Sequence, residues 1–224
     1  MLKDKNIVVT GGFGTLGRAV VAKLEREGAR VAVIDLAPVP ERWSGAAIGG
    51  VDLADPAQAE RALAGEAFAG GLDGLVNVAG GFVWEPVEGG EVSSWDRMHR
   101  MNLGTALAMS RAALPLLKRS GGAIVNIGAA ASARAAAGMG AYTASKSAVA
   151  RLTEAMADEL KDAGVRVNAV LPTTLDTPVN RADMPDVDPA RWVKPEALAE
   201  VIAFLLGDGA GAVTGALLPV TGRS

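Results

Sequence analysis

The stretch NIVVTGGFGTLG, residues 6–17, joins a short apolar run rich in β-branched residues to a glycine-rich turn. Gly12, Gly14 and Gly17 fit the pattern G-x-G-x-x-G, and a helical pattern follows them directly. Such a turn needs glycine because the chain turns sharply, a pyrophosphate approaches the backbone, and the helix packs closely on the strand. The N–H groups and dipole at the helix start also favour an anion. This stretch predicts a dinucleotide-binding unit, with a merely tight strand-to-helix turn as the alternative.

The rest of the chain repeats this alternation of strand-length apolar runs and helix-length segments. The apolar runs are continuous, as in parallel strands that are covered on both faces. We therefore predict an α/β fold: a single doubly wound Rossmann domain over residues 1–224, with a seven-stranded parallel sheet and helices on both faces. The Pro- and Asp-rich segment 173–194 lacks periodicity and is predicted to be a substrate loop. The expected strands are 6–10, 30–35, 46–53, 72–80, 122–129, 165–172 and 212–220, and the expected helices are 15–28, 55–65, 91–119, 139–163 and 195–206.

Composition and charge exclude several classes of binding partner for this protein. The 224 residues carry a net charge of -3 and include no cysteine, so we expect no nucleic-acid surface, no disulfide and no metal site. No apolar run approaches the roughly 20 residues that span a bilayer, so no membrane partner is expected. The start, MLKDKN, lacks the apolar region of a secretory signal, which predicts a cytoplasmic protein. A small-molecule substrate is the expected ligand.

Asp35 ends the second apolar run, eighteen residues after Gly17. A carboxylate at this point accepts hydrogen bonds from a ribose 2′-hydroxyl and repels a 2′-phosphate, so it predicts NAD(H) in preference to NADP(H). Two alternatives stay open. Asp35 could simply close the strand as a turn residue, and Arg18 or Arg42 could soften the discrimination.

Tyr142 and Lys146 are four residues apart in a helical pattern, so their side chains project from one face. A free tyrosine has a pKa of about 10, and a nearby ammonium favours the phenolate. We therefore expect Lys146 to make proton exchange at Tyr142 feasible near neutral pH. Lysine can also hold ribose hydroxyls. The pair predicts a proton-transfer site.

With these motifs the chain resembles the short-chain dehydrogenase/reductase family over essentially its whole length. The matching pieces are T-G-G-x-G-x-x-G at 10–17, Asp35, Asp52-Leu53, N-V-A-G at 77–80, Asn102, Y-x-x-x-K at 142–146 and P-x-x-L-x-T at 172–177. The resemblance implies that Tyr142, Lys146 and Asn102 are catalytic, with Asn102 holding a proton-relay water beside the lysine. It also implies a homodimer or homotetramer formed through helices 91–119 and 139–163. The predicted cofactor-binding residues are Gly11, Gly12, Phe13, Gly14, Thr15, Leu16, Gly17, Asp35, Asp52, Leu53, Asn77, Ala79, Gly80, Tyr142, Lys146, Pro172, Leu175 and Thr177.

The sequence departs from the family pattern at two positions. Thr15 replaces the middle glycine of T-G-x-x-x-G-x-G, and Ala129 occupies the position of the family's catalytic serine, thirteen residues before Tyr142. Loss of one donor aimed at a developing oxyanion costs about 10²–10³ in rate, so an ordinary ketone reductase should be poor with this site. Ser132, the substrate or a water could supply the missing donor.

Within the family, the chain resembles dihydropteridine reductase. The similarity lies in V-A-G-G-F at 78–82, G-A at 128–129 and VLPTTLDTPVNRADMPD at 170–186. It implies hydride transfer from NADH to a quinonoid dihydropterin, with Tyr142 as proton donor and no serine. A conjugated C=N acceptor is already electrophilic, so a proton delivered to nitrogen can replace the serine contact. Phe82 and Trp84 could stack on such a flat ring or fill a core or an interface.

Two other functions stay open. One is a general NAD-dependent alcohol dehydrogenase or carbonyl reductase. The other is a non-catalytic NAD(H)-binding regulatory protein, against which the joint presence of Tyr142, Lys146 and Asn102 argues.

Overall fold

A seven-stranded sheet runs through the computed structural model, which describes residues 2–65, 68 and 70–223. The strand order is β3-β2-β1-β4-β5-β6-β7 and every neighbouring pair is parallel, so the predicted doubly wound α/β fold is confirmed. Met1 and Ser224, the ends of the expected domain, lie outside the described residues. The strands are β1 (Asn6–Thr10), β2 (Arg30–Ile34), β3 (Ala46–Ile48), β4 (Gly74–Asn77), β5 (Ala123–Ile127), β6 (Arg166–Pro172) and β7 (Leu217–Val220).

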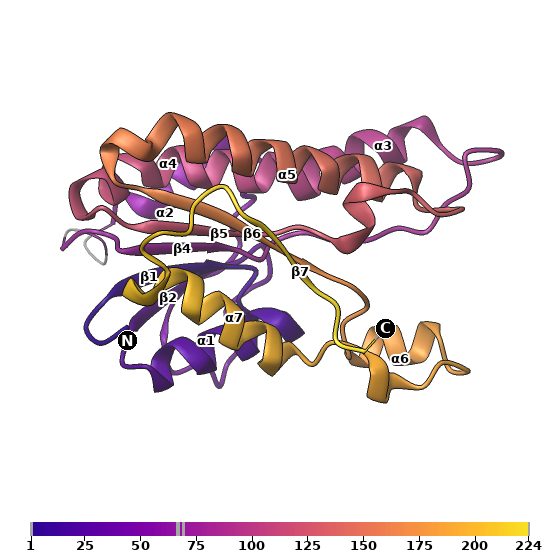
Figure 1. Ribbon diagram of the computed structural model, residues 1–224, viewed down its shortest axis with the longest axis horizontal. Coiled ribbons are helices and arrows are strands. Elements are labelled where there is room, and N and C mark those ends of the chain that lie inside the picture. Colours follow the sequence, from indigo (N-terminus) through magenta and orange to yellow (C-terminus); the bar gives the residue numbers. More distant parts are fainter. Residues whose placement is uncertain (1, 66–67, 69, 224) are drawn as a thin grey trace.

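Helices cover both faces of the sheet (Figure 1). Helices α1 (Thr15–Arg26) and α7 (Pro195–Leu206) pack on one face, and α2 (Pro56–Leu63), α4 (Thr105–Ser120) and α5 (Gly140–Leu160) lie on the other. Strand β1 shows why its apolar run is continuous, because Ile7 and Val9 belong to the α1/α7 core while Val8 belongs to the opposite core. No helix within the described ranges is long and apolar enough to cross a membrane.

Six of the seven strands are shorter than predicted. Strands β3, β4 and β7 are each shorter by five residues, and glycines explain the ends of β3 and β7. The chain leaves β3 at Gly49 and Gly50, and Gly50 has φ +74°, in the left-handed region that favours glycine. Before β7, Gly215 also has φ +74°, so the expected strand from 212 begins only at Leu217. Strand β4 begins at Gly74 instead of residue 72 and ends at Asn77 instead of residue 80.

The prediction of one continuous helix over 91–119 is wrong. The segment forms α3 (Val92–Met98), a π-helix (His99–Gly104) and then α4. Thr105, the first residue of α4, donates from its side chain to the carbonyl of Met101 in the π-helix (2.7 Å). π-Helical turns often occur at functional sites. The helix expected to reach residue 163 ends at Leu160 and continues as a 3₁₀ turn (Lys161–Ala163).

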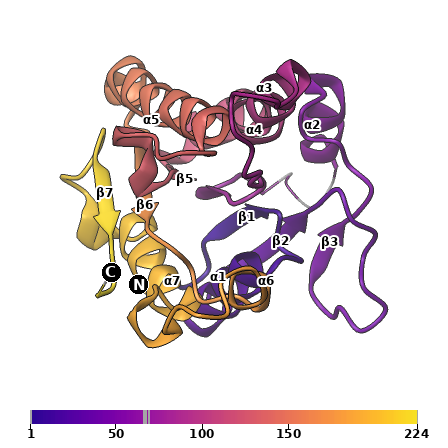
Figure 2. The same ribbon diagram turned by 90° about the vertical axis from the view of Figure 1, so that its right-hand side faces the viewer.

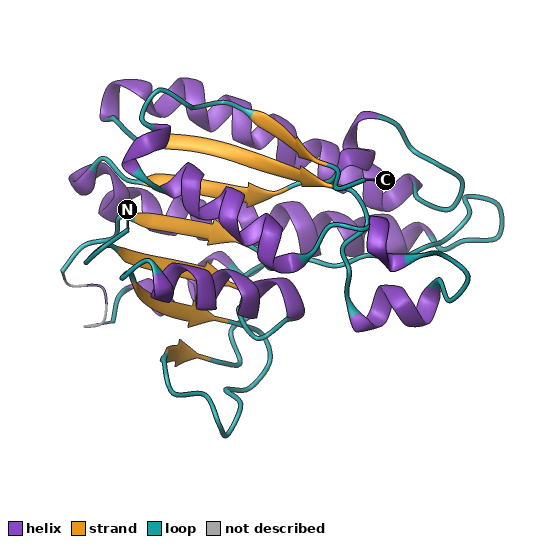
Figure 3. Ribbon diagram, turned by 60° about the horizontal axis from the view of Figure 1, so that its bottom comes forward, coloured by secondary structure: helices purple, strands orange, loops and turns teal. Residues whose placement is uncertain are grey.

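The segment 173–194, predicted to be a substrate loop, contains short helical elements that its lack of periodicity did not indicate, and its role towards a substrate stays a prediction. It contains α6 (Pro178–Asp183) and a 3₁₀ turn (Pro189–Arg191), each with proline in the first turn. Thr177 caps α6, because its hydroxyl accepts from the N–H of Asn180 (3.2 Å), and Asp188 caps the 3₁₀ turn in the same way. Threonine or aspartate directly before proline is the helix-start signal that the sequence analysis overlooked. Figure 3 shows these short helices beyond the carboxyl ends of the strands.

A buried amide network ties β4 and β5 to the helices above them. Asn77 donates to Asn126 (2.8 Å) and Ser110 (2.9 Å), and Asn126 donates to the hydroxyl of Thr153 (2.9 Å). All four side chains are buried. Asn77, predicted to bind the cofactor, therefore has its amide nitrogen committed to β5 and α4.

An Asn126→Ala variant is expected to lower the free energy of unfolding by about 3 kcal/mol, because buried partners left unsatisfied cost about 1–3 kcal/mol each. Chemical denaturation measures this loss. Asn6→Ala, the same change at a partly exposed position at the start of β1, is the control and should cost less than about 1 kcal/mol. Equal losses in both variants would refute a special role for the network.

Candidate active site

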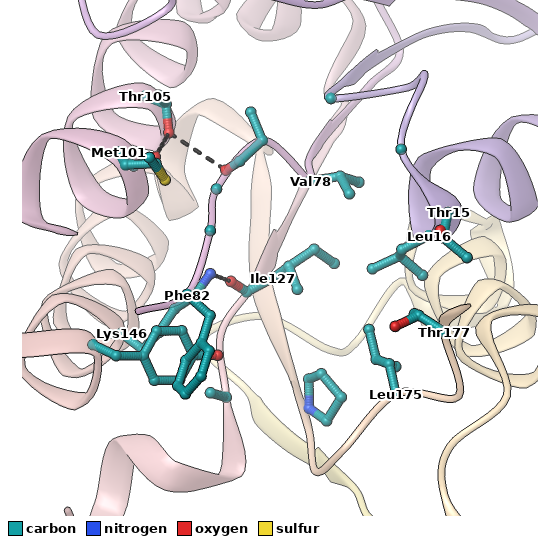
Figure 4. Close-up of a pocket in the computed structure, with 18 of the residues that line it drawn as sticks. Thr15, Leu16, Val78, Phe82, Met101, Thr105, Ile127, Lys146, Leu175 and Thr177 are labelled. Carbon is teal, nitrogen blue, oxygen red and sulfur yellow. Dashed lines mark hydrogen bonds between the residues drawn. The ribbon is translucent and has the colours of Figure 1, made fainter. Parts of the chain in front are cut away.

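A cleft of about 1330 Å³ opens at the carboxyl ends of the strands, where ligands bind in doubly wound sheets. Figure 4 shows Thr15, Leu16, Leu175 and Thr177 on one wall and Phe82 and Lys146 on the other. The structure brings most of the predicted site residues together here. Those that line the cleft are Gly11, Gly14, Thr15, Leu16, Gly17, Asp35, Asp52, Leu53, Ala79, Gly80, Tyr142, Lys146, Pro172, Leu175 and Thr177.

The glycine-rich turn packs as closely as predicted. A Cβ on Gly17 would lie 2.2 Å from the carbonyl oxygen of Gly11, so α1 can approach the turn only with glycine there. Gly12 lies under the turn against Val33, which explains its absence from the cleft lining. Helix α1 has no side-chain cap and no acidic residue in its first turn. Its first N–H groups are therefore suited to an anion in the cleft.

Asp35 lies directly after β2 with its carboxylate fixed by backbone N–H groups. One oxygen accepts from Phe13 (2.9 Å) and the other from Ala37 (3.0 Å). A carboxylate has about four lone-pair sites, so capacity remains for a hydroxyl donor in the cleft. Phe13 itself does not line the cleft and contributes through this N–H. Farther along the wall, Asp52 accepts from Arg100 (2.6 Å).

Thr10 is a site-forming residue that the sequence analysis did not single out. Its buried hydroxyl accepts from the N–H groups of Val78 and Ala79, both at 3.1 Å, and so fixes the turn after β4 beside the end of β1. Its position as the last residue of β1, directly before the glycine turn, was the sequence feature that could have identified it. Its partners are 68 and 69 residues away, so local spacing could not identify them.

Tyr142 and Lys146 both reach the cleft from α5. The Lys146 ammonium donates to the carbonyl of Ile127 (2.7 Å), and burial lowers the pKa of this lysine to about 8. Burial raises the pKa of Tyr142 to about 12. A nearby ammonium was expected to favour the phenolate, but burial is what shifts the pKa of Tyr142, and it shifts it upward. Proton exchange between Tyr142 and a substrate stays a prediction. The phenol is protonated at neutral pH, as a proton donor must be.

Phe82 packs edge-on against Tyr142, with ring centroids 4.9 Å apart and an interplanar angle of 83°. Phe82 and Trp84 are both more than half exposed, and both line the cleft. The Trp84 indole donates to the carbonyl of Ala137 (3.1 Å), which ties the segment after β4 to the segment before α5. Core packing is thus excluded for both rings, and they form an aromatic wall of the cleft, with Phe82 beside the phenol.

A family model described as short chain dehydrogenase matches residues 5–188. The chain belongs to the short-chain dehydrogenase/reductase family. It is 37% identical to 2-(S)-hydroxypropyl-CoM dehydrogenase 3 of Xanthobacter autotrophicus over 99% of this chain and 96% of the relative. It is 38% identical to the inactive 2-(S)-hydroxypropyl-CoM dehydrogenase 2 of the same organism, over 88% and 95%. A 3-ketoacyl-(acyl-carrier-protein) reductase from Brucella melitensis, solved with NADH, superimposes with a TM-score of 0.87 at 28% identity over the full length of both chains.

The residues of this short-chain dehydrogenase/reductase fit a nicotinamide dinucleotide. The glycine turn, the uncapped start of α1 and the carboxylate of Asp35 lie along one continuous cleft that also holds Tyr142 and Lys146. When bound, such a cofactor supplies or accepts the hydride. The chain's own groups at the other end are the phenol, which can give a proton, and the ammonium, which can hold ribose hydroxyls. No group of acidic or histidine side chains in the described ranges could hold a metal ion.

Asn102, expected to hold a relay water, lies in the wall of the cleft and not on its surface. Its amide nitrogen donates to the carbonyl of Gly81 (3.1 Å) and the hydroxyl of Ser145 (2.9 Å), and its oxygen accepts from the N–H of Gly81 (3.0 Å). The side chain is 1% exposed. These bonds fix the turn at Gly81 against α5, and the relay-water role of Asn102 stays a prediction. Ser145, which the sequence analysis did not single out, also donates to the carbonyl of Tyr142 (2.7 Å).

Ala129 follows β5 and lines the cleft at the position of the family's serine. Ser132 is not among the lining residues. Its N–H donates to the carbonyl of Ala129 (3.0 Å) and its own carbonyl accepts from Ser147 (2.6 Å), which holds this 3₁₀ turn in place. The structure therefore gives no support to Ser132 as a substitute donor.

Proposed function

We propose that the protein is an NAD(H)-dependent oxidoreductase that reduces a quinonoid dihydropterin, or a similarly activated flat acceptor, with Tyr142 as the proton donor. The observation that carries the proposal is Ala129 in a cleft that retains Tyr142 and Lys146. A site that keeps its proton donor but lacks the second hydroxyl suits an acceptor that needs no further polarisation. The protonated phenol and the aromatic wall of Phe82 and Trp84 agree with this.

Asp35 supports NAD(H) over NADP(H) in this proposal. Its carboxylate is fixed at the cleft surface by two N–H groups, so it cannot easily move away from a 2′-phosphate. The resulting repulsion favours the cofactor with a free 2′-hydroxyl.

A general NAD-dependent alcohol dehydrogenase or carbonyl reductase is the second candidate, because one Xanthobacter relative is named a dehydrogenase of a hydroxypropyl compound. A non-catalytic NAD(H)-binding protein is the third, because the other Xanthobacter relative is named inactive. The relatives reported above bear names other than dihydropteridine reductase, so the pterin substrate rests on the site and on the resemblance of the sequence.

Oxidation of NADH should be measured with quinonoid dihydropterin and, in parallel, with a panel of simple ketones. We expect pterin turnover, with ketone turnover at least about a hundredfold slower because one oxyanion donor is missing. Faster turnover of ketones would favour the second candidate. Tight NADH binding with no turnover of either acceptor would favour the third.

A further inference from the structure

A cluster of one cation and two aromatic rings lies beside Asp35 at the edge of the cleft. The loop between β2 and β3, which projects from the edge of the sheet (Figures 2 and 3), brings Trp43 against the glycine-rich turn. The rings of Phe13 and Trp43 meet edge to face, with centroids 5.0 Å apart. The guanidinium of Arg18 lies over the ring of Trp43, 5.6 Å from its centroid.

Arg18 is held in this cluster and away from Asp35. The Nε of Arg18 donates to the backbone carbonyl of Phe13 (2.8 Å). The backbone N–H of Phe13 donates to the carboxylate of Asp35 (2.9 Å). Among the described residues Arg18 forms no ion pair with Asp35, and it does not line the cleft as Asp35 does. The guanidinium and the carboxylate therefore bind different backbone groups of Phe13, and the guanidinium also lies on the ring of Trp43.

The separation matters for cofactor choice. A guanidinium free to move at this corner would do one of two things: pair with the carboxylate of Asp35 and compete with a ribose hydroxyl, or bind a 2′-phosphate with its planar fork. Both would reduce the preference for a cofactor that has a free 2′-hydroxyl. Cation–π attraction to Trp43 opposes both.

We propose that Trp43 is a specificity-determining residue, which keeps Arg18 from the ribose end of the cleft and so enforces NAD(H) over NADP(H). This inference rests on the NAD(H) preference in the proposed function. Trp43 lies outside the cleft lining, so in this proposal it acts by fixing the position of the Arg18 charge.

The indole N–H of Trp43 offers a matched control. It is buried and has no hydrogen-bond partner among the described residues, so the ring is held through its faces and not through its nitrogen. Phenylalanine at this position keeps a ring for Arg18 and removes the unsatisfied donor. Trp43→Phe should therefore preserve the cofactor preference, whereas Trp43→Leu keeps an apolar side chain but removes the cation–π contact.

Calorimetric titration of NADH and NADPH into the wild type, Trp43→Leu, Trp43→Phe, Arg18→Gln and the double variant Trp43→Leu/Arg18→Gln tests the inference. The quantity compared is the ratio of the NADPH Kd to the NADH Kd. Trp43→Leu should lower this ratio about fivefold, the factor expected from one cation–π contact. Trp43→Phe should leave the ratio within about twofold, and removal of Arg18 in the double variant should restore it.

Each other outcome is decisive. An unchanged ratio in Trp43→Leu, including a parallel weakening of both cofactors, would show that Trp43 is only structural. The same fall in the double variant would show that Arg18 is not the mediator. NADH binding to the wild type with an unchanged ratio in Trp43→Leu removes this inference alone, whereas wild-type protein that binds neither cofactor removes the proposed function as well.

Discussion

A Tyr142→Phe variant should lose about 10³-fold in turnover, within the range of about 10²–10⁴ typical of a general acid. The change removes one hydroxyl and keeps the ring that packs edge-on against Phe82. NADH affinity and thermal stability should therefore stay close to those of the wild type. Steady-state kinetics with quinonoid dihydropterin, combined with calorimetric NADH binding, measures the two effects separately.

This result would separate a chemical from a structural role. Loss of turnover with unchanged NADH affinity supports Tyr142 as the proton donor. If the variant kept wild-type turnover, another group would have to deliver the proton, and the mechanism proposed for the cleft would be wrong. A fall in NADH affinity of the same size as the fall in turnover would place Tyr142 in cofactor binding alone.

An Ala129→Ser variant should gain about a hundredfold in activity on simple ketones, because the hydroxyl supplies the oxyanion donor that the cleft lacks. Turnover of the quinonoid pterin should change little, since that acceptor needs no such contact. Ala129 is 4% exposed and lies at the cleft surface after β5, so the added oxygen would point at a confined site. The ratio of kcat/KM for a ketone to that for the pterin measures the change.

Ala131→Ser is the matched control for this substitution. Ala131 also lines the cleft, two residues farther along the same segment, but does not occupy the position of the family's serine. It should leave both activities near the wild-type values. If Ala129→Ser raised pterin and ketone turnover in parallel, the idea that an activated acceptor tolerates the alanine would be wrong.

Sequence patterns were sufficient to predict the features that depend on residues close together in the chain. Continuous apolar runs indicated strands buried on both faces, and β1 contacts both cores as expected. The glycine at position 17 was predicted from its turn, and the shared face of Tyr142 and Lys146 followed from helical spacing. The carboxylate after β2 was found in the same way, because its distance from the glycine turn reflects one strand–helix–strand unit.

Features set by contacts between distant segments could not be predicted. Asn102 in the π-helix binds a turn twenty-one residues away, and the network of Asn77 joins β4 to β5, α4 and α5. The pKa of Tyr142 was expected to fall because a nearby charge was considered without the burial that opposes it. The role of Trp43 required the position of a loop that sequence periodicity does not describe.

The hydroxyl of Thr10, bonded to two N–H groups beyond β4, makes the floor of the cleft a single rigid unit across two strands. The walls around Trp84 and α6, by contrast, are built on connecting segments outside the sheet. Mutational libraries aimed at new substrates should therefore concentrate on those walls. Such libraries would change which acceptor molecules the cleft takes and leave the residues of the nucleotide site unchanged.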